Sequence, residues 1–99
     1  MRLSGKLRAP RFGGARLAGL QAPNTTFDTA DFGRADLSGA DVAGCHFIEC
    51  GFVGSDLRRA SFRGAHLERG YLTSANVAGT DFTDARFDGI DRRHVVEKP

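Results

Sequence analysis

Three residues of this 99-residue chain have the types that a nucleophilic catalyst combines: Asp56, Ser61 and His66. A serine hydroxyl becomes a nucleophile when a histidine takes its proton and a carboxylate orients that histidine. His46 and His66 offer a second kind of chemistry, because two imidazoles held close together can bind a transition metal ion. Whether either chemistry is available depends on the elements that carry these residues.

A five-residue repeat runs through most of the chain. A large apolar residue recurs at every fifth position, and the residue two places before it is usually small. This period fits neither an amphipathic helix nor an alternating strand, so it predicts a repeat architecture whose unit is the pentapeptide. One bulky and one small inward position per unit would fill a narrow tube. The large positions are Phe27, Phe32, Leu37, Val42, Phe47, Phe52, Leu57, Phe62, Leu67, Leu72, Val77, Phe82 and Phe87.

Segments 35–39 (ADLSG), 40–44 (ADVAG) and 60–64 (ASFRG) resemble the pentapeptide-repeat family, whose motif reads roughly A(D/N)LXX. The resemblance extends over residues 25–89. It implies an all-β fold, a right-handed quadrilateral β-helix of about four coils, in which four pentapeptides make one coil. Residues twenty apart would then stack on one face. Side-chain type supports this spacing, because one column would be Leu7, Phe27, Phe47, Leu67 and Phe87.

We expect three segments in the chain. Residues 1–24 would form a basic N-terminal cap with imperfect repeats, residues 25–89 the β-helix, and residues 90–99 a short C-terminal cap or tail. The tail offers Ile90, Val95 and Val96 to cover the last coil.

The repeat is irregular at residues 20–24. Leu20 is too large for the small position, Ala22 is too small for the large one, and Pro23 has no backbone N–H to give to a strand ladder. We expect a bulge or a turn there.

The implied fold argues against catalysis. Asp56, Ser61 and His66 occupy the same outward position of successive units, which turn by about a right angle, so their side chains would point in different directions. The glycines gather at the last position of the unit, where they permit tight turns, and none belongs to a phosphate-binding loop. We therefore expect no enzyme activity and no cofactor.

His46 and His66 would lie side by side on one outer face, with Arg86 next in line. No cysteine or carboxylate occupies the same ladder position, so we expect surface histidines and no metal. Cys45 and Cys50 fall in small inward positions on neighbouring faces. This placement predicts buried thiols and not a disulfide or metal pair.

Charge is unevenly distributed along the chain. Residues 1–24 contain five basic residues and no acid, whereas residues 25–90 contain ten acids and six arginines. A basic segment attracts nucleic acid, but no series of exposed aromatic residues accompanies it for base stacking, so we expect no direct nucleic-acid binding. No apolar run is long enough to span a membrane. The composition therefore predicts a soluble, cytoplasmic protein with no membrane association.

Surface recognition by a rigid rod is the leading hypothesis for the function. The chain would be a non-catalytic protein–protein interaction module or scaffold, whose partner is another protein or a second copy bound through the coil ends. Exposed apolar residues among polar neighbours suggest a contact patch. The predicted contact residues are the apolar Ile48, Val53 and Tyr71 and the basic Arg58, Arg59 and Arg63.

The resemblance also implies an alternative function. Some pentapeptide-repeat proteins mimic duplex DNA with an acidic rod, bind DNA gyrase, a topoisomerase, and protect it from drugs or toxins. Duplex DNA carries one charge per about 1.7 Å of axis, which residues 25–90, with ten acids against six arginines, do not approach. The candidate acidic surface consists of Asp31, Asp36, Asp41, Asp56, Asp81 and Asp84.

Overall fold

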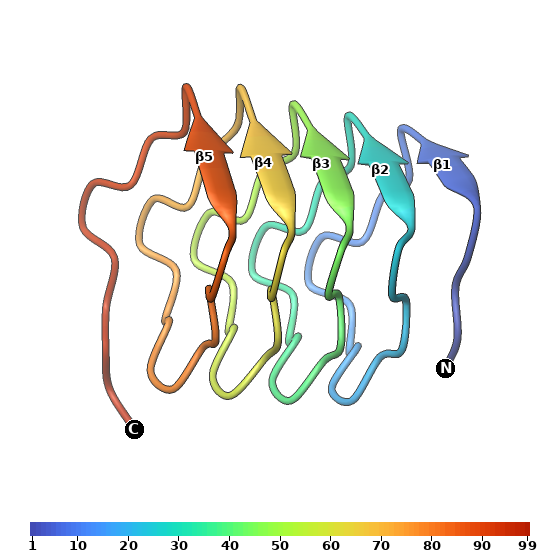
Figure 1. Cartoon of the computed structure of the whole chain (residues 1–99). Helices are drawn as coiled ribbons and strands as arrows, with labels where there is room; N and C mark the ends of the chain where they lie inside the picture. Colours follow the sequence, from blue (N-terminus) through green and yellow to red (C-terminus); the bar gives the residue numbers. More distant parts are fainter.

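Five short strands lie side by side on one face of the computed structural model, which describes all residues from 1 to 99 (Figure 1). Each strand pairs in parallel with the next one along the chain, and Phe27 lies between Leu7 and Phe47. The order in the sheet is thus the order in the chain, as a solenoid requires. The strands are β1 (Lys6–Arg8), β2 (Thr26–Asp28), β3 (His46–Ile48), β4 (His66–Glu68) and β5 (Arg86–Asp88).

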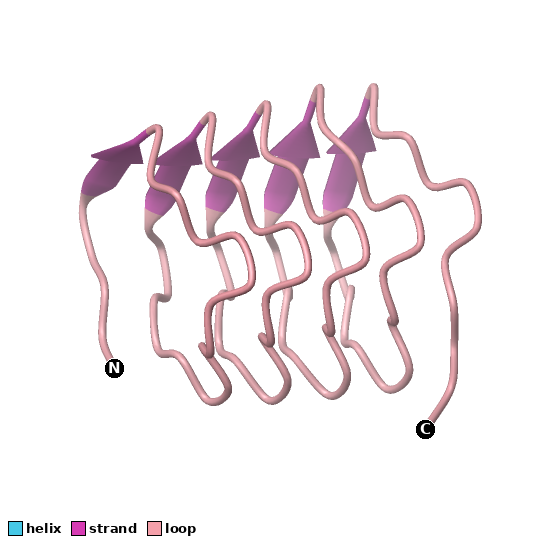
Figure 2. Ribbon diagram, turned by 180° about the vertical axis from the view of Figure 1, so that it is seen from behind, coloured by secondary structure: helices cyan, strands magenta, loops and turns pink.

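The other three sides of each coil consist of turns and single bridging residues (Figure 2). Asp36 bridges Asp56, again twenty residues later. The N–H of Leu37 donates to the carbonyl of Asp56 at 2.8 Å, and the N–H of Asp56 donates back to the carbonyl of Ala35 at 2.9 Å. This ladder confirms the predicted right-handed quadrilateral β-helix of about four coils. No helix in the structure is long and apolar enough to cross a membrane.

We name the four sides by their large inward positions. The strand face is centred on Leu7, Phe27, Phe47, Leu67 and Phe87; face 2 on Phe12, Phe32, Phe52 and Leu72; face 3 on Leu17, Leu37, Leu57 and Val77; and face 4 on Ala22, Val42, Phe62 and Phe82. The last residue of each unit is the corner at which the chain turns to the next face.

The core is a column of side chains along the axis, in which 21 buried residues form one cluster. Rings one coil apart stack nearly parallel: Phe27 and Phe47 have centroids 5.3 Å apart with 6° between their planes. Rings on neighbouring faces meet edge to face, as Phe47 and Phe52 do at 74°. The strand spacing of about 4.8 Å brings the rings into contact, and such pairs add about 0.5 to 1.5 kcal/mol beyond burial.

The two cysteines are free, buried thiols, as predicted. The thiol of Cys45 donates to the carbonyl of Ala22 at 2.8 Å, and that of Cys50 donates to the carbonyl of Phe27 at 3.2 Å. Burial raises the pKa of both thiols to about 11. At neutral pH they are therefore protonated core side chains and not thiolates that could attack a substrate or bind a metal.

From residue 9 to residue 94, every corner residue has a positive φ. Gly39 has a φ of 66°, and glycine adopts such values without strain. From the sequence we expect glycine at these turns, but ten residues with side chains adopt a positive φ as well. The left-handed conformation costs each of them about 1 to 2 kcal/mol. Coil closure at a fixed spacing thus overrides the local preference. These residues are Ala9, Asn24, Thr29, Arg34, Glu49, Arg59, Arg69, Ser74, Asp84 and His94.

Residues 20–24 form an ordinary turn of the coil, and the bulge allowed by the sequence is absent. The N–H of Ala22 donates to the next coil at 2.9 Å. Pro23 removes no ladder bond, because the equivalent N–H of Gly33 donates to a side chain of its own unit. Leu20 and Ala22 are both buried and exchange the usual large and small sizes, which preserves the volume that the unit places in the core.

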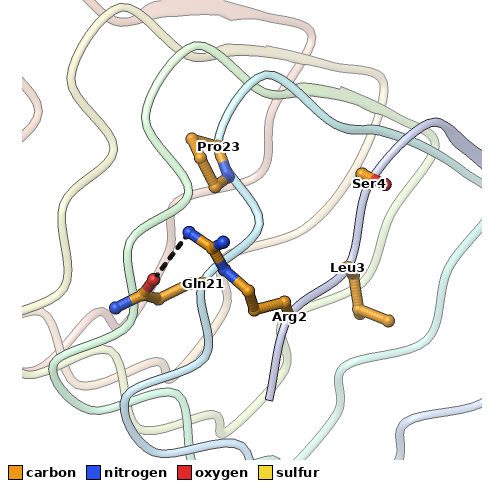
Figure 3. A pocket seen from close by; sticks show the side chains of 5 residues that line it. All are labelled: Arg2, Leu3, Ser4, Gln21 and Pro23. Carbon is orange, nitrogen blue, oxygen red and sulfur yellow. Dashed lines mark hydrogen bonds between the residues drawn. The ribbon is translucent and has the colours of Figure 1, made fainter.

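The first coil is one residue shorter than the others. Arg2 bridges Gln21, nineteen residues later, and its guanidinium donates to the Gln21 side-chain oxygen at 3.2 Å. The two residues face a hollow of about 300 Å³ that Leu3, Ser4 and Pro23 complete (Figure 3). Only one of the five lining residues is hydrophobic. Ligand pockets are mostly apolar and enclosed, so we do not treat this hollow as the functional site.

The last coil ends the column with a charged residue in a large position of face 2. The guanidinium of Arg92 lies 5.0 Å from the centre of the Phe87 ring. Ile90 packs against the core, as expected, whereas Val95 is 39% exposed. Val96 bridges the coil before it from an outward position. The tail therefore covers the end of the core only in part.

Candidate interaction surfaces

Face 2 has an uncharged patch on the adjacent coils of Phe52 and Leu72. Val53 and Tyr71 are 47% and 55% exposed. They lie on adjacent coils, because Tyr71 bridges Gly51, two residues before Val53. None of the six outward positions of these two coils carries a charge, in a chain of which 26% of the residues are charged. We call these positions the face 2 patch: Gly51, Val53, Gly54, Tyr71, Thr73 and Ser74.

The chemistry of the face 2 patch suits contact with a protein. Interface cores are depleted of charge and enriched in tyrosine. The Tyr71 hydroxyl makes no hydrogen bond within the chain, so it can donate to or accept from a partner. Two glycines bring the backbone to the surface beside these side chains, and the result is a low-relief face with one aromatic anchor.

The third predicted apolar residue, Ile48, lies outside this patch. It is partly buried in β3 on the strand face, one corner away from Val53. Its partners in the sheet are Asp28 and Glu68. Ile48 is thus an apolar interruption of an acidic column, and the structure does not bring it together with Tyr71.

The predicted basic residues lie on other faces. Arg58 is on face 3 and is paired with Asp56 at 2.7 Å, and Arg63 is on face 4 and is paired with Asp81 at 3.1 Å. Arg59 is the corner between them and makes no ion pair. Two of the three charges are therefore balanced within the chain, and none of the three belongs to the face 2 patch.

The six aspartates of the predicted acidic surface are spread over three faces. In five of them a carboxylate oxygen accepts the backbone N–H two residues ahead, at 2.8 to 3.1 Å. These are Asx turns, which aspartate favours, so the carboxylates close the repeating turn. In these five units the aspartate comes just before the large residue, which was the sequence signal for this role. Asp31 lies on face 2, Asp36 and Asp56 on face 3, and Asp41, Asp81 and Asp84 on face 4 or its corner.

Three carboxylates on faces 2 to 4 have lowered pKa values. Hydrogen bonds from Thr83 lower the pKa of Asp81 to about 2, and those from Arg93 lower the pKa of Asp91 to about 2. The hydrogen bond from the Arg58 side chain lowers the pKa of Asp56. Because the unfolded chain binds these protons more readily, the stabilisation is complete above the unfolded pKa of about 3.9. It is lost as the pH falls through the folded values.

We therefore expect the urea midpoint of unfolding to fall as the pH is lowered from about 4 to about 2. Asp81→Asn keeps the acceptor oxygen of the turn but removes the titration, so its midpoint should fall less steeply across this window. Asp84→Asn is the control, because Asp84 makes no hydrogen bond in the structure. Identical slopes for Asp81→Asn and the wild type would show that this carboxylate does not link folding to pH.

Two histidines stack on the strand face. The rings of His46 in β3 and His66 in β4 have centroids 4.8 Å apart and planes inclined by 4°. Nε2 of His46 lies 2.7 Å from a carboxylate oxygen of Glu68, and Nε2 of His66 lies 2.7 Å from one of Asp88. The sequence predicts the neighbouring histidines but not these acids. Each acid is 22 residues after its histidine, so it lies in the next coil and in the neighbouring column of the strand face.

The residues with the types of a catalytic triad do not meet. Asp56 bridges Asp36 on face 3, Ser61 bridges Asp41 on face 4, and His66 is in β4 on the strand face. Each lies on a different side of the coil, as the sequence predicts.

The comparisons with known proteins agree with the five-residue repeat of the sequence. A family model described as pentapeptide repeats matches eight copies, over residues 11–47 and 50–89. No curated protein sequence matches the chain. Two similar solved structures are HetL, a pentapeptide repeat protein involved in heterocyst differentiation regulation from the cyanobacterium Nostoc sp. strain PCC 7120, and full-length QnrB1, a plasmid-mediated fluoroquinolone resistance protein.

The likeness to these two structures concerns the fold alone. HetL superposes with a TM-score of 0.60 at 20% identity, over 85% of this chain and 41% of HetL. QnrB1 superposes with a TM-score of 0.55 at 23% identity, over 93% of this chain and 46% of QnrB1. The chain thus spans less than half the length of either protein.

Proposed function

This chain belongs to the pentapeptide-repeat family, and we propose that it is a non-catalytic binding module that presents the face 2 patch to a protein partner. The observation that carries the proposal is this patch, in which two exposed side chains stand among six adjacent positions without charge. None of the six residues is charged, so contact through the patch desolvates no charged side chain within it.

The coil makes the patch rigid before a partner arrives. The N–H of Phe52 donates to the carbonyl of Tyr71 at 2.8 Å, and the N–H of Gly54 donates to the carbonyl of Thr73 at 3.0 Å. Both coils are thereby fixed relative to each other. A surface that is already ordered avoids part of the entropy cost of association, and this supports a scaffold role.

Val53→Asp is expected to weaken binding of the partner at least about tenfold, because it places an unpaired charge in a desolvated contact. The partner would first be isolated with the wild-type chain, and its affinity for each variant would then be measured by titration. Ala18→Asp is the matched control: Ala18 is exposed and has the same place in its unit, but on face 3. Equal losses from both variants would argue against the face 2 patch.

We also propose that copies of the chain associate through their coil ends. Phe82, Phe87 and Ile90 are only partly buried at the C-terminal end of the core. The exposed ladder there offers unpaired backbone groups, which favour edge-to-edge pairing. The solution mass measured by light scattering should rise with protein concentration. A monomer mass that stays constant over the series would contradict end-to-end association.

The alternative function is binding of DNA gyrase by a DNA mimic. Its support is the fold that the chain shares with QnrB1, a fluoroquinolone resistance protein. The placement of the acids favours the binding module instead, because the aspartates point from three faces and five of them close turns. A gyrase supercoiling assay separates the two: protection of the enzyme from a fluoroquinolone by this chain would favour the mimic.

A further inference from the structure

The stacked histidines on the strand face and the neighbouring Glu68 form a cluster of potential metal ligands that has no part in the function proposed for face 2. One ring nitrogen of His46, one ring nitrogen of His66 and a carboxylate oxygen of Glu68 offer three ligand atoms that all lie within 4.8 Å of one another. We propose that these residues form a binding site for a divalent transition metal ion, with Zn²⁺ as the best-suited ion. Two imidazoles and one carboxylate, with a fourth position open to water, are a usual donor set for zinc.

The geometry requires only small side-chain movements. A tetrahedral ion at about 2.0 to 2.1 Å from each ligand places the ligand atoms roughly 3.3 Å apart. His46 and Glu68 are already 2.7 Å apart, so the ion takes the place of the proton that this pair shares. Because the ligand atoms all lie within 4.8 Å of one another, no pair has to close by more than roughly 1.5 Å, which rotation of the His66 and Glu68 side chains can supply.

The backbone beneath the cluster is already fixed. The N–H of His46 donates to the coil before it at 3.1 Å, and the N–H of His66 donates to the carbonyl of Cys45 at 2.8 Å. The side chains of His46, His66 and Glu68 are 38%, 29% and 26% exposed. The cluster is therefore partly sheltered and open on one side, so an ion can enter without local unfolding.

Charge in the surrounding columns favours a divalent cation. Glu68 and Asp88 contribute two negative charges and Arg86 contributes one positive charge, so these three side chains carry a net negative charge beside the imidazoles. Asp88 is also paired with Arg86 at 3.0 Å, so we assign it as a positioning residue that orients His66. Mg²⁺ and Ca²⁺ prefer sites made entirely of oxygen ligands, whereas imidazole nitrogen favours zinc and the later transition metals.

The test is a calorimetric titration of the full chain with Zn²⁺ at pH 7.5, with Co²⁺ as a spectroscopic probe. We expect saturation at one ion per chain, a higher melting temperature with Zn²⁺, and visible absorption bands typical of tetrahedral Co²⁺. His66→Ala and Glu68→Gln should each weaken binding at least about tenfold, and Asp88→Asn about 10- to 100-fold. His94→Ala is the control, because His94 lies in a corner outside the cluster and should leave binding unchanged.

Three results would overturn the proposal. The first is the absence of saturable binding up to about 1 mM Zn²⁺. The second is unchanged binding in the His46→Ala/His66→Ala double variant; both positions face outward, so circular dichroism should show that it folds. The third is an intense sulfur-to-cobalt charge-transfer band, which would assign the ion to Cys45 or Cys50.

Discussion

Replacement of Phe52 by alanine is expected to lower the free energy of unfolding by about 3 to 5 kcal/mol. The ring is 1% exposed and stacks on Phe32 with centroids 5.0 Å apart. It also meets the edges of Phe47 and Phe62 at 5.2 and 5.9 Å. Hydrogen bonds to the coils on both sides fix the spacing along the axis, so the walls cannot close around the cavity. The loss should therefore lie near the upper end of this range.

Urea denaturation followed by circular dichroism would measure the effect. Phe82→Ala is the matched control, because Phe82 occupies a large inward position near the C-terminal end and is already partly exposed. Its loss should be clearly smaller. If Phe52→Ala does not fold, Phe52→Leu gives the same comparison with a smaller cavity. Equal losses at positions 52 and 82 would contradict a core whose packing is tightest in its central coils.

Gly70→Ala is expected to destabilise the chain by about 1 to 3 kcal/mol, the range of an overpacked core. A Cβ atom at this position would overlap the carbonyl oxygen of Cys50. That oxygen cannot move away freely, because it accepts the N–H of Tyr71 at 3.1 Å. Gly70 does not have a positive φ. Close approach of two coils, and not backbone freedom, is therefore the reason for glycine here.

Gly51→Ala provides the comparison for this prediction. Gly51 also lacks a positive φ, and a Cβ atom there would have no neighbour within 4 Å. Its substitution should change the unfolding free energy by less than about 0.5 kcal/mol. Thermal unfolding of the two variants side by side is sufficient. A Gly70→Ala variant as stable as Gly51→Ala would mean that the two coils separate more easily than the ladder suggests.

The fold could be predicted from the sequence because the inward positions repeat without exception over most of the chain. Phe27 and Phe47 stack as the column spacing requires. Local irregularities were harder to interpret, as Pro23 shows. A missing N–H matters only where the ladder uses it, and the backbone hydrogen bonds show that this position is not one of those. Sequence patterns reveal which side chains face inward but not which backbone groups are already satisfied.

The surface could be predicted only in part, because exposure outside the core depends on neighbours twenty residues away. Val53 and Tyr71 do share a face, but Ile48 lies around the corner and is partly buried. The partner of His46 was missed for a similar reason: Glu68 lies in the adjacent strand β4, but diagonally opposite His46 and not directly beside it. A linear search at the repeat spacing finds vertical neighbours and overlooks diagonal ones.

The most direct test of the proposed function is photo-crosslinking from a single position on each of two faces. A photoreactive amino acid would replace Val53 in one variant and Ala18 in the other, and both would be irradiated in the cells that make the protein. Binding through the face 2 patch predicts a protein crosslinked from position 53 and absent from position 18. The same protein captured with equal yield from both positions, or from position 18 alone, would contradict it.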